Sequence, residues 1–185
     1  MSAATATPST TAAPQGNGFA SWRETVVELK GLEPVPARIY GEKKRGQASP
    51  LVVHYHGGAF TAGGLDCGVK LASMLAEAGA IVVSIAYPLA PAHPFPQALD
   101  VGYGVLEWAW KQRAKLAGTG APVFLAGEEA GGNLAAATAL IARDRAHPPL
   151  AGQVLVSPML DPCTGMASVR EFNCTETQGK WAEGW

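Results

Sequence analysis

Short apolar runs, separated by polar and glycine-rich segments, predict six strands along the chain. Residues 24–30 alternate polar and apolar side chains, as a half-buried strand does, and residues 37–40 follow as a second strand after a proline turn. The other four runs are strongly apolar, and the first two of them are typical of strands buried on both faces. They are residues 51–55, 81–86, 123–126 and 153–157.

Three segments carry apolar residues at helical spacing. They are residues 71–78, closed by Gly79, residues 98–116, and residues 132–144. Four prolines between residues 88 and 96 predict an irregular loop before the second of these helices. The alternation of strands and helices predicts an α/β domain with a mostly parallel sheet and helices on both faces.

Composition narrows the class of protein. The chain has 185 residues, 48% of them hydrophobic, and a net charge of -1, which fits one globular domain over residues 21–185 and gives no footprint for nucleic acid. Residues 1–20 have almost nothing to bury and lack the apolar core of a secretory signal, so we expect a disordered tail. No apolar run is long enough for a membrane span, and we expect a cytoplasmic location.

The cysteines predict neither a metal site nor a disulfide framework. Cys67, Cys163 and Cys174 form no CxxC pair and no cluster with zinc-binding spacing. An odd, scattered set suits a reducing compartment, so we interpret these side chains as buried or incidental thiols. No metal and no cofactor are expected.

Two glycine segments follow predicted strands. His-Gly-Gly-Ala-Phe at residues 56–60 follows the strand 51–55, and such glycines let backbone N–H groups approach one oxygen, as an oxyanion hole requires. Taken alone, a glycine pair after a strand also fits an ordinary turn. Gly-Glu-Glu-Ala-Gly-Gly at residues 127–132 lies between a strand and a helix, the context of a Gly-x-Ser-x-Gly nucleophile elbow. Glu129 stands where that motif has serine.

Two further segments, residues 87–96 and 155–161, complete a pattern in order and spacing. The chain resembles the hormone-sensitive-lipase-like carboxylesterases of the α/β-hydrolase superfamily over residues 22–185. The resemblance implies an α/β-hydrolase fold that is truncated after about the sixth strand and incomplete at its C-terminus, with the tail 1–20 associated with a cap. It also implies hydrolysis of a small acyl-ester-like ligand without a cofactor.

The resemblance assigns roles around the two glycine segments. These roles are the nucleophile position at Glu129, an oxyanion hole at Gly57, Gly58, Ala59 and Ala130, supporting residues His56 and Glu128, and an acyl pocket near Phe60.

Three departures from the family bear on activity. Glu129 replaces the serine, and the family's triad Asp and His belong to a C-terminal portion that this sequence does not have. His147, the one histidine after the elbow, fits an exposed loop position, and Asp161 matches a structural position of the family. Ala59 replaces a third glycine in the first loop, a mild change because its backbone N–H remains.

Three interpretations of Glu129 stay open. In the preferred one, its carboxylate fills the oxyanion hole and the chain is inactive as an esterase. In the second, the protein keeps the acyl pocket and binds a small ligand without catalysis. In the third, Glu129 is a carboxylate nucleophile, as Asp is in related α/β-hydrolases that open epoxides.

The edge of the sheet raises a separate expectation. The last strand, residues 153–157, would present unpaired N–H and C=O groups and an apolar flank. We therefore expect an oligomer or a completing chain at this edge.

Overall fold

The computed structural model describes residues 18–44 and 46–161. Most of the tail expected over residues 1–20, together with Cys163 and Cys174, lies outside the described residues. In the described part, no helix has the length and apolar character needed to cross a membrane.

The described residues form one six-stranded sheet in the order β1-β2-β4-β3-β5-β6. β1 and β2 pair with each other antiparallel, and β2 is also antiparallel to β4. The other neighbouring pairs are parallel, as the apolar runs predicted. The strands are β1 (Trp22–Val27), β2 (Val35–Tyr40), β3 (Leu51–Tyr55), β4 (Ile81–Ile85), β5 (Val123–Glu128) and β6 (Gly152–Val156).

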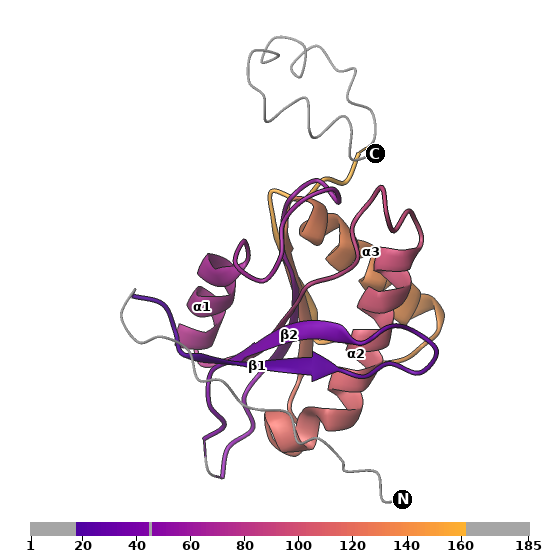
Figure 1. The fold of residues 1–185 in the computed structure, drawn as a ribbon. Helices are drawn as coiled ribbons and strands as arrows, with labels where there is room; N and C mark the ends of the chain where they lie inside the picture. The colour runs from indigo at the N-terminus through magenta and orange to yellow at the C-terminus, as the bar shows by residue number, and fades with distance from the viewer. Residues whose placement is uncertain (1–17, 45, 162–185) are drawn as a thin grey trace, which may run out of the picture.

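Helices cover both faces of the sheet. α1 (Val69–Glu77) lies on one face, and α2 (Gln97–Leu116) and α3 (Ala130–Asp144) lie on the other (Figure 1). A large apolar cluster fills the space between the sheet and the two longer helices, and a smaller one lies toward α1. Every residue of β3 and β4 is buried, which confirms the prediction that these strands are covered on both faces.

The parallel strands bring three loops to one edge of the sheet. β3, β4 and β5 run in the same direction, so the segments after Tyr55, Ile85 and Glu128 emerge side by side. In open α/β sheets this carboxyl edge is where ligands bind. The two glycine segments and the proline-rich loop therefore meet at one place.

Some boundaries differ from expectation. β5 extends to Glu128 and α3 begins at Ala130, two residues before the predicted start of the helix. Cys67 is a free and exposed thiol, so of the two alternatives, buried or incidental, it is not the buried one. His147 is exposed, as predicted.

Candidate active site

Glu129 lies in a strained turn between β5 and α3. Its backbone has φ 52° and ψ -117°, a conformation that L-residues rarely adopt. Two backbone hydrogen bonds fix the turn to β6 and to the segment after it. The N–H of Glu129 donates to the carbonyl of Val156 over 3.0 Å, and the carbonyl of Glu129 accepts from the N–H of Met159 over 3.0 Å. The turn therefore presents the side chain of Glu129 at the carboxyl edge of the sheet.

Glycines make this turn possible because backbone groups pass very close to it. A Cβ atom added to Gly131 would lie 2.1 Å from the carbonyl oxygen of Tyr55, and one added to Gly127 would lie 2.2 Å from the carbonyl oxygen of Gly131. No other residue fits at these two positions without moving β3 or the start of α3. The glycine spacing of the elbow thus has a steric cause.

The loop after β3 is also strained. Gly58, Ala59 and Phe60 have φ values of 122°, 51° and 60°, and the carbonyl of Gly58 accepts hydrogen bonds from the N–H groups of Thr61 and Ala62. Three successive residues with positive φ turn the backbone sharply. This turn directs the N–H of Gly58 toward the elbow.

The loop and the elbow meet through one hydrogen bond. The N–H of Gly58 donates to Oε2 of Glu129 over 3.2 Å. A Cβ atom at Gly57 would lie 3.0 Å from the same oxygen, so the carboxylate is seated against the loop backbone. Among the described residues, no hydrogen bond links this carboxylate to the N–H of Gly57, Ala59 or Ala130.

His56 lies behind the loop in a buried position. Its Nδ1–H donates to the carbonyl of Gly57 over 2.7 Å, and its ring stacks on Tyr87 with ring centroids 4.3 Å apart. Burial lowers the pKa of His56 below its usual range, so the neutral ring is favoured. In the described part of the chain, Nε2 of this ring is buried without a hydrogen-bond partner.

Tyr87 connects the proline-rich loop to the same place. Its hydroxyl donates to the carbonyl of His56 over 2.8 Å, and the edge of its ring faces Phe60 with ring centroids 6.4 Å apart. Burial, together with the nearby carboxylates of Glu128 and Glu129, raises the pKa of Tyr87. The tyrosine stays neutral and acts as a hydrogen-bond donor at ordinary pH.

Sequence reasoning did not foresee the role of His54. Its Nε2 lies 2.8 Å from Oε2 of Glu128, and its Nδ1 lies 2.9 Å from the hydroxyl of Ser84. The signal was present, because a histidine in an otherwise apolar, doubly covered strand must find polar partners. The sequence did not show which partners these are.

The other two histidines lie away from Glu129. His147 follows α3, and the 15 residues of that helix separate it from the elbow, roughly 20 Å along the helix axis. His93 bonds Gln97 through Nδ1 over 2.8 Å. His147 is therefore too far away to take a proton at position 129, and the side chain of His93 is engaged with Gln97.

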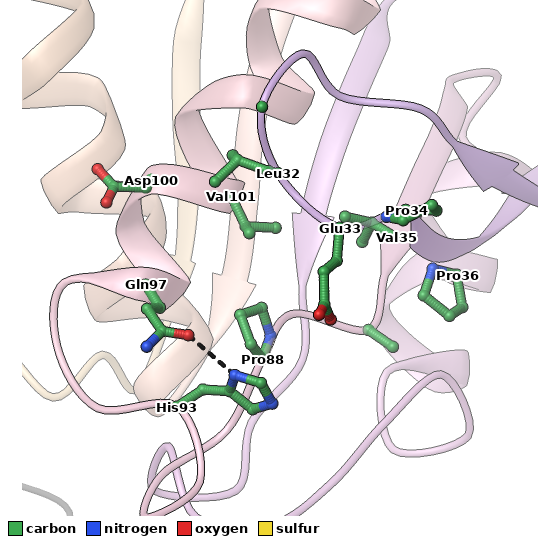
Figure 2. A pocket seen from close by; sticks show the side chains of 12 residues that line it. Leu32, Glu33, Pro34, Val35, Pro36, Pro88, His93, Gln97, Asp100 and Val101 are labelled. Carbon is green, nitrogen blue, oxygen red and sulfur yellow. Dashed lines mark hydrogen bonds between the residues drawn. The ribbon is translucent and has the colours of Figure 1, made fainter.

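His93 lies on the wall of a separate pocket of about 440 Å³ (Figure 2). The pocket lies between the segment before β2 and the start of α2, and Ala86 and Pro88 form part of its lining. Tyr87, between these two, stacks instead on His56. No group of three or more His, Cys, Asp or Glu side chains that could hold a metal ion is found in residues 18–44 and 46–161.

Sequence comparison finds relatives that are named as esterases and lipases. The family described as alpha/beta hydrolase fold matches residues 52–182. Carboxylesterase NlhH of Mycobacterium tuberculosis is 41% identical over 136 residues, which are 73% of this chain and 43% of that protein. Human hormone-sensitive lipase is 45% identical over 91 residues, 49% of this chain and 8% of the lipase.

Comparisons of structure agree. The esterase LipW from Mycobacterium marinum superposes with a TM-score of 0.80 at 34% identity, covering 90% of this chain and 53% of LipW. A bacterial heroin esterase gives a TM-score of 0.81 at 28% identity, covering 91% of this chain and 54% of that protein. The chain thus spans about half of these solved structures and less than half of NlhH.

Proposed function

Because the chain belongs to the α/β-hydrolase fold family, we propose that it carries the elbow and oxyanion loop of a carboxylesterase-type site, and that Glu129 blocks this site. The ligand class would be small carboxylic esters, and no cofactor takes part. Glu129, at the nucleophile position, would occupy the place of the reacting group.

One contact carries the proposal. Oε2 of Glu129 accepts the hydrogen bond of the Gly58 N–H over 3.2 Å. In an acyl-transfer enzyme, loop N–H groups of this kind stabilise the negative oxygen that develops on the substrate in the transition state. A carboxylate already bound there competes with that oxygen for the donor. It also places a negative charge where the transition state gains one.

The chemistry at position 129 is a second obstacle. A serine becomes nucleophilic when a histidine takes its proton. The two histidines near the elbow are already engaged, because His54 bonds Glu128 and Ser84, and His56 bonds the carbonyl of Gly57. In the serine protease subtilisin, loss of the serine nucleophile lowers the rate by a factor of about 10⁶. The residual activity of a site without its triad is only about 10³–10⁴ over water.

The test is turnover of p-nitrophenyl butyrate by the full chain. We expect no hydrolysis above buffer for the wild type, for Glu129→Ala or for Glu129→Ser. Glu77→Ala, which removes a carboxylate at the end of α1, is the matched control. Wild-type turnover that disappears in Glu129→Ala and survives in the control would overturn the proposal.

Two further outcomes separate the alternatives. An acyl adduct on Glu129, found by mass spectrometry after mixing with the ester, would identify a carboxylate nucleophile instead. Saturable binding of ethyl butyrate without turnover would favour a ligand-binding protein that keeps the acyl pocket near Phe60.

A further inference from the structure

A chain of buried polar side chains crosses one face of the sheet beneath the elbow. Ser84 on β4, His54 on β3 and Glu128 at the end of β5 are linked by hydrogen bonds of 2.9 and 2.8 Å. Ser84 and His54 are fully buried, and the side chain of Glu128 is 19% exposed. The surrounding cluster on this face is apolar. Polar groups in such a setting are costly unless each one is bonded.

The geometry fixes the position of the ring and of its protons. An ionised carboxylate only accepts, so Nε2 of His54 carries a proton and donates to Glu128. In the neutral ring, Nδ1 then accepts from the hydroxyl of Ser84. The ring lies close to the backbone of Gly68, where an added Cβ atom would lie 2.4 Å from Cε1 of His54 and would clash with it.

Two successive carboxylates lie beside the same loop. A Cβ atom at Gly57 would lie 3.0 Å from Oε2 of Glu129 and 3.4 Å from Cγ of Glu128. Two carboxylates near one loop repel each other, and either carboxylate is a strong acceptor for a loop N–H. Yet Glu129 bonds the loop through Gly58, while Glu128 bonds His54.

We propose that His54 is a positioning residue of this site. Its Nε2–H holds the Glu128 carboxylate on the α1 face of the sheet and keeps it from the loop amides. The Gly58 N–H is thereby left to the group at position 129. Within the described residues, His54 is the one basic side chain that bonds Glu128 or Glu129, and it bonds Glu128. The proposal rests on the proposed function, since it concerns which group occupies the oxyanion donor.

The test follows the Gly58 amide by NMR in the ¹⁵N-labelled full chain, across the range in which carboxylates titrate. Apart from any step of the neighbouring histidine, the wild type should show one carboxylate step, which is lost in Glu129→Gln and kept in Glu128→Gln. His54→Leu should add a second step, because the freed Glu128 carboxylate reaches the loop. Adding Glu128→Gln to His54→Leu should remove that second step.

Two variants separate positioning from a general structural effect. His54→Gln keeps a side-chain N–H near the place of Nε2 and should restore the single step. Ser84→Ala removes only the other hydrogen bond of the ring and should also keep one step. His56 and Tyr87 also lie beside the carboxylates, and any step of theirs stays in every variant and is not counted among the carboxylate steps.

The single wild-type step in a folded His54→Leu protein would overturn the proposal. If His54→Leu does not fold, as loss of amide dispersion would show, the test uses the tautomer of His54 instead, read from the ¹⁵N shifts of its ring nitrogens. The Nε2–H tautomer should dominate in the wild type and lose that preference in Glu128→Leu, which leaves no acceptor at this place, and an unchanged tautomer would contradict the proposal. Failure of the proposed function looks different: the Gly58 step would persist in Glu129→Gln while the His54 signature stays intact.

Discussion

The hydroxyl of Tyr87 donates to the backbone carbonyl of His56 over 2.8 Å, and the two rings stack with centroids 4.3 Å apart. Both residues are buried. The loop after β4 therefore supports the loop after β3 at the residue that precedes its two glycines. This contact ties the proline-rich loop to the candidate site.

Tyr87→Phe tests the contact. The ring stacking stays, but the carbonyl of His56 loses its buried donor, so we expect a loss of about 1–3 kcal/mol in the free energy of unfolding. Tyr103→Phe is the control, because it removes a similar 2.8 Å bond to the carbonyl of the exposed His147, where water can take its place. Denaturant titration measures both variants. Equal losses of unfolding free energy in the two variants would contradict the idea that an unpaired carbonyl costs more when it is buried.

Gly131→Ala should be far more damaging. The added Cβ would meet two backbone oxygens, at 2.1 Å from Tyr55 and 2.4 Å from His56, and neither can move without displacing β3. Overpacking against fixed backbone predicts a loss of at least about 3 kcal/mol. Gly64→Ala, with no atom within 4 Å of the added Cβ, should stay within about 0.5 kcal/mol of the wild type. Thermal unfolding compares the two, and a mild effect of Gly131→Ala would show that the elbow can shift.

The backbone strain at position 129 separates two substitutions that both remove the carboxylate. Glycine tolerates φ 52° and ψ -117°, whereas alanine keeps the strain. We expect Glu129→Gly to be more stable than Glu129→Ala by about 1 kcal/mol, since strain relief of about 1–3 kcal/mol exceeds the entropy cost of glycine. The difference in melting temperature measures this term directly. The reverse order would mean that the turn relaxes once the carboxylate is gone.

The buried His56 predicts a pH dependence of stability. Its pKa is lower in the folded state than in the unfolded state, mainly because of burial. The unfolded chain therefore binds a proton first, and stability falls as the pH drops below about 6.5. Between about pH 7 and about pH 5 we therefore expect the free energy of unfolding to decrease. His56→Gln should flatten the slope, and His147→Gln, at an exposed position, should leave it unchanged.

The parts of the fold that the sequence predicted share one physical cause. β3 and β4 were predicted from continuous apolar runs, because such runs are stable only when both faces are covered. The start of α3 was misplaced by two residues because Gly131 disfavours a helix by propensity. Close packing against the end of β3 requires this glycine and overrides that preference.

In the candidate site, too, local features could be predicted and long-range contacts could not. The elbow and the glycine loop were predicted from short sequence motifs, since each lies within a few consecutive residues. The partners of His54 lie 30 and 74 residues away, and only the strand register brings them together. Pairing of side chains across parallel strands is therefore what a single sequence could not supply here.

The outer strand of the sheet leads to a prediction about association. β6 pairs with β5 on one side, and within the described residues no strand lies on its other side. Val154 and Val156 are 38% and 41% exposed, and the strand carries neither a charged residue nor a proline. Natural sheet edges usually carry such residues, because an unprotected edge pairs with other chains.

Val154→Lys should therefore reduce self-association of the chain. A lysine on the exposed face of the edge places a charge where a second strand would pack, and its long stem lets the ammonium reach water without a large loss of stability. Met74→Lys is the matched control, since Met74 is 57% exposed on α1, away from the edge. Sedimentation velocity at low and high micromolar concentration should show wild-type oligomers that Val154→Lys disperses and Met74→Lys does not. A wild type that stays monomeric throughout would show that the edge is already protected, and equal effects of the two lysines would point to a general effect of charge.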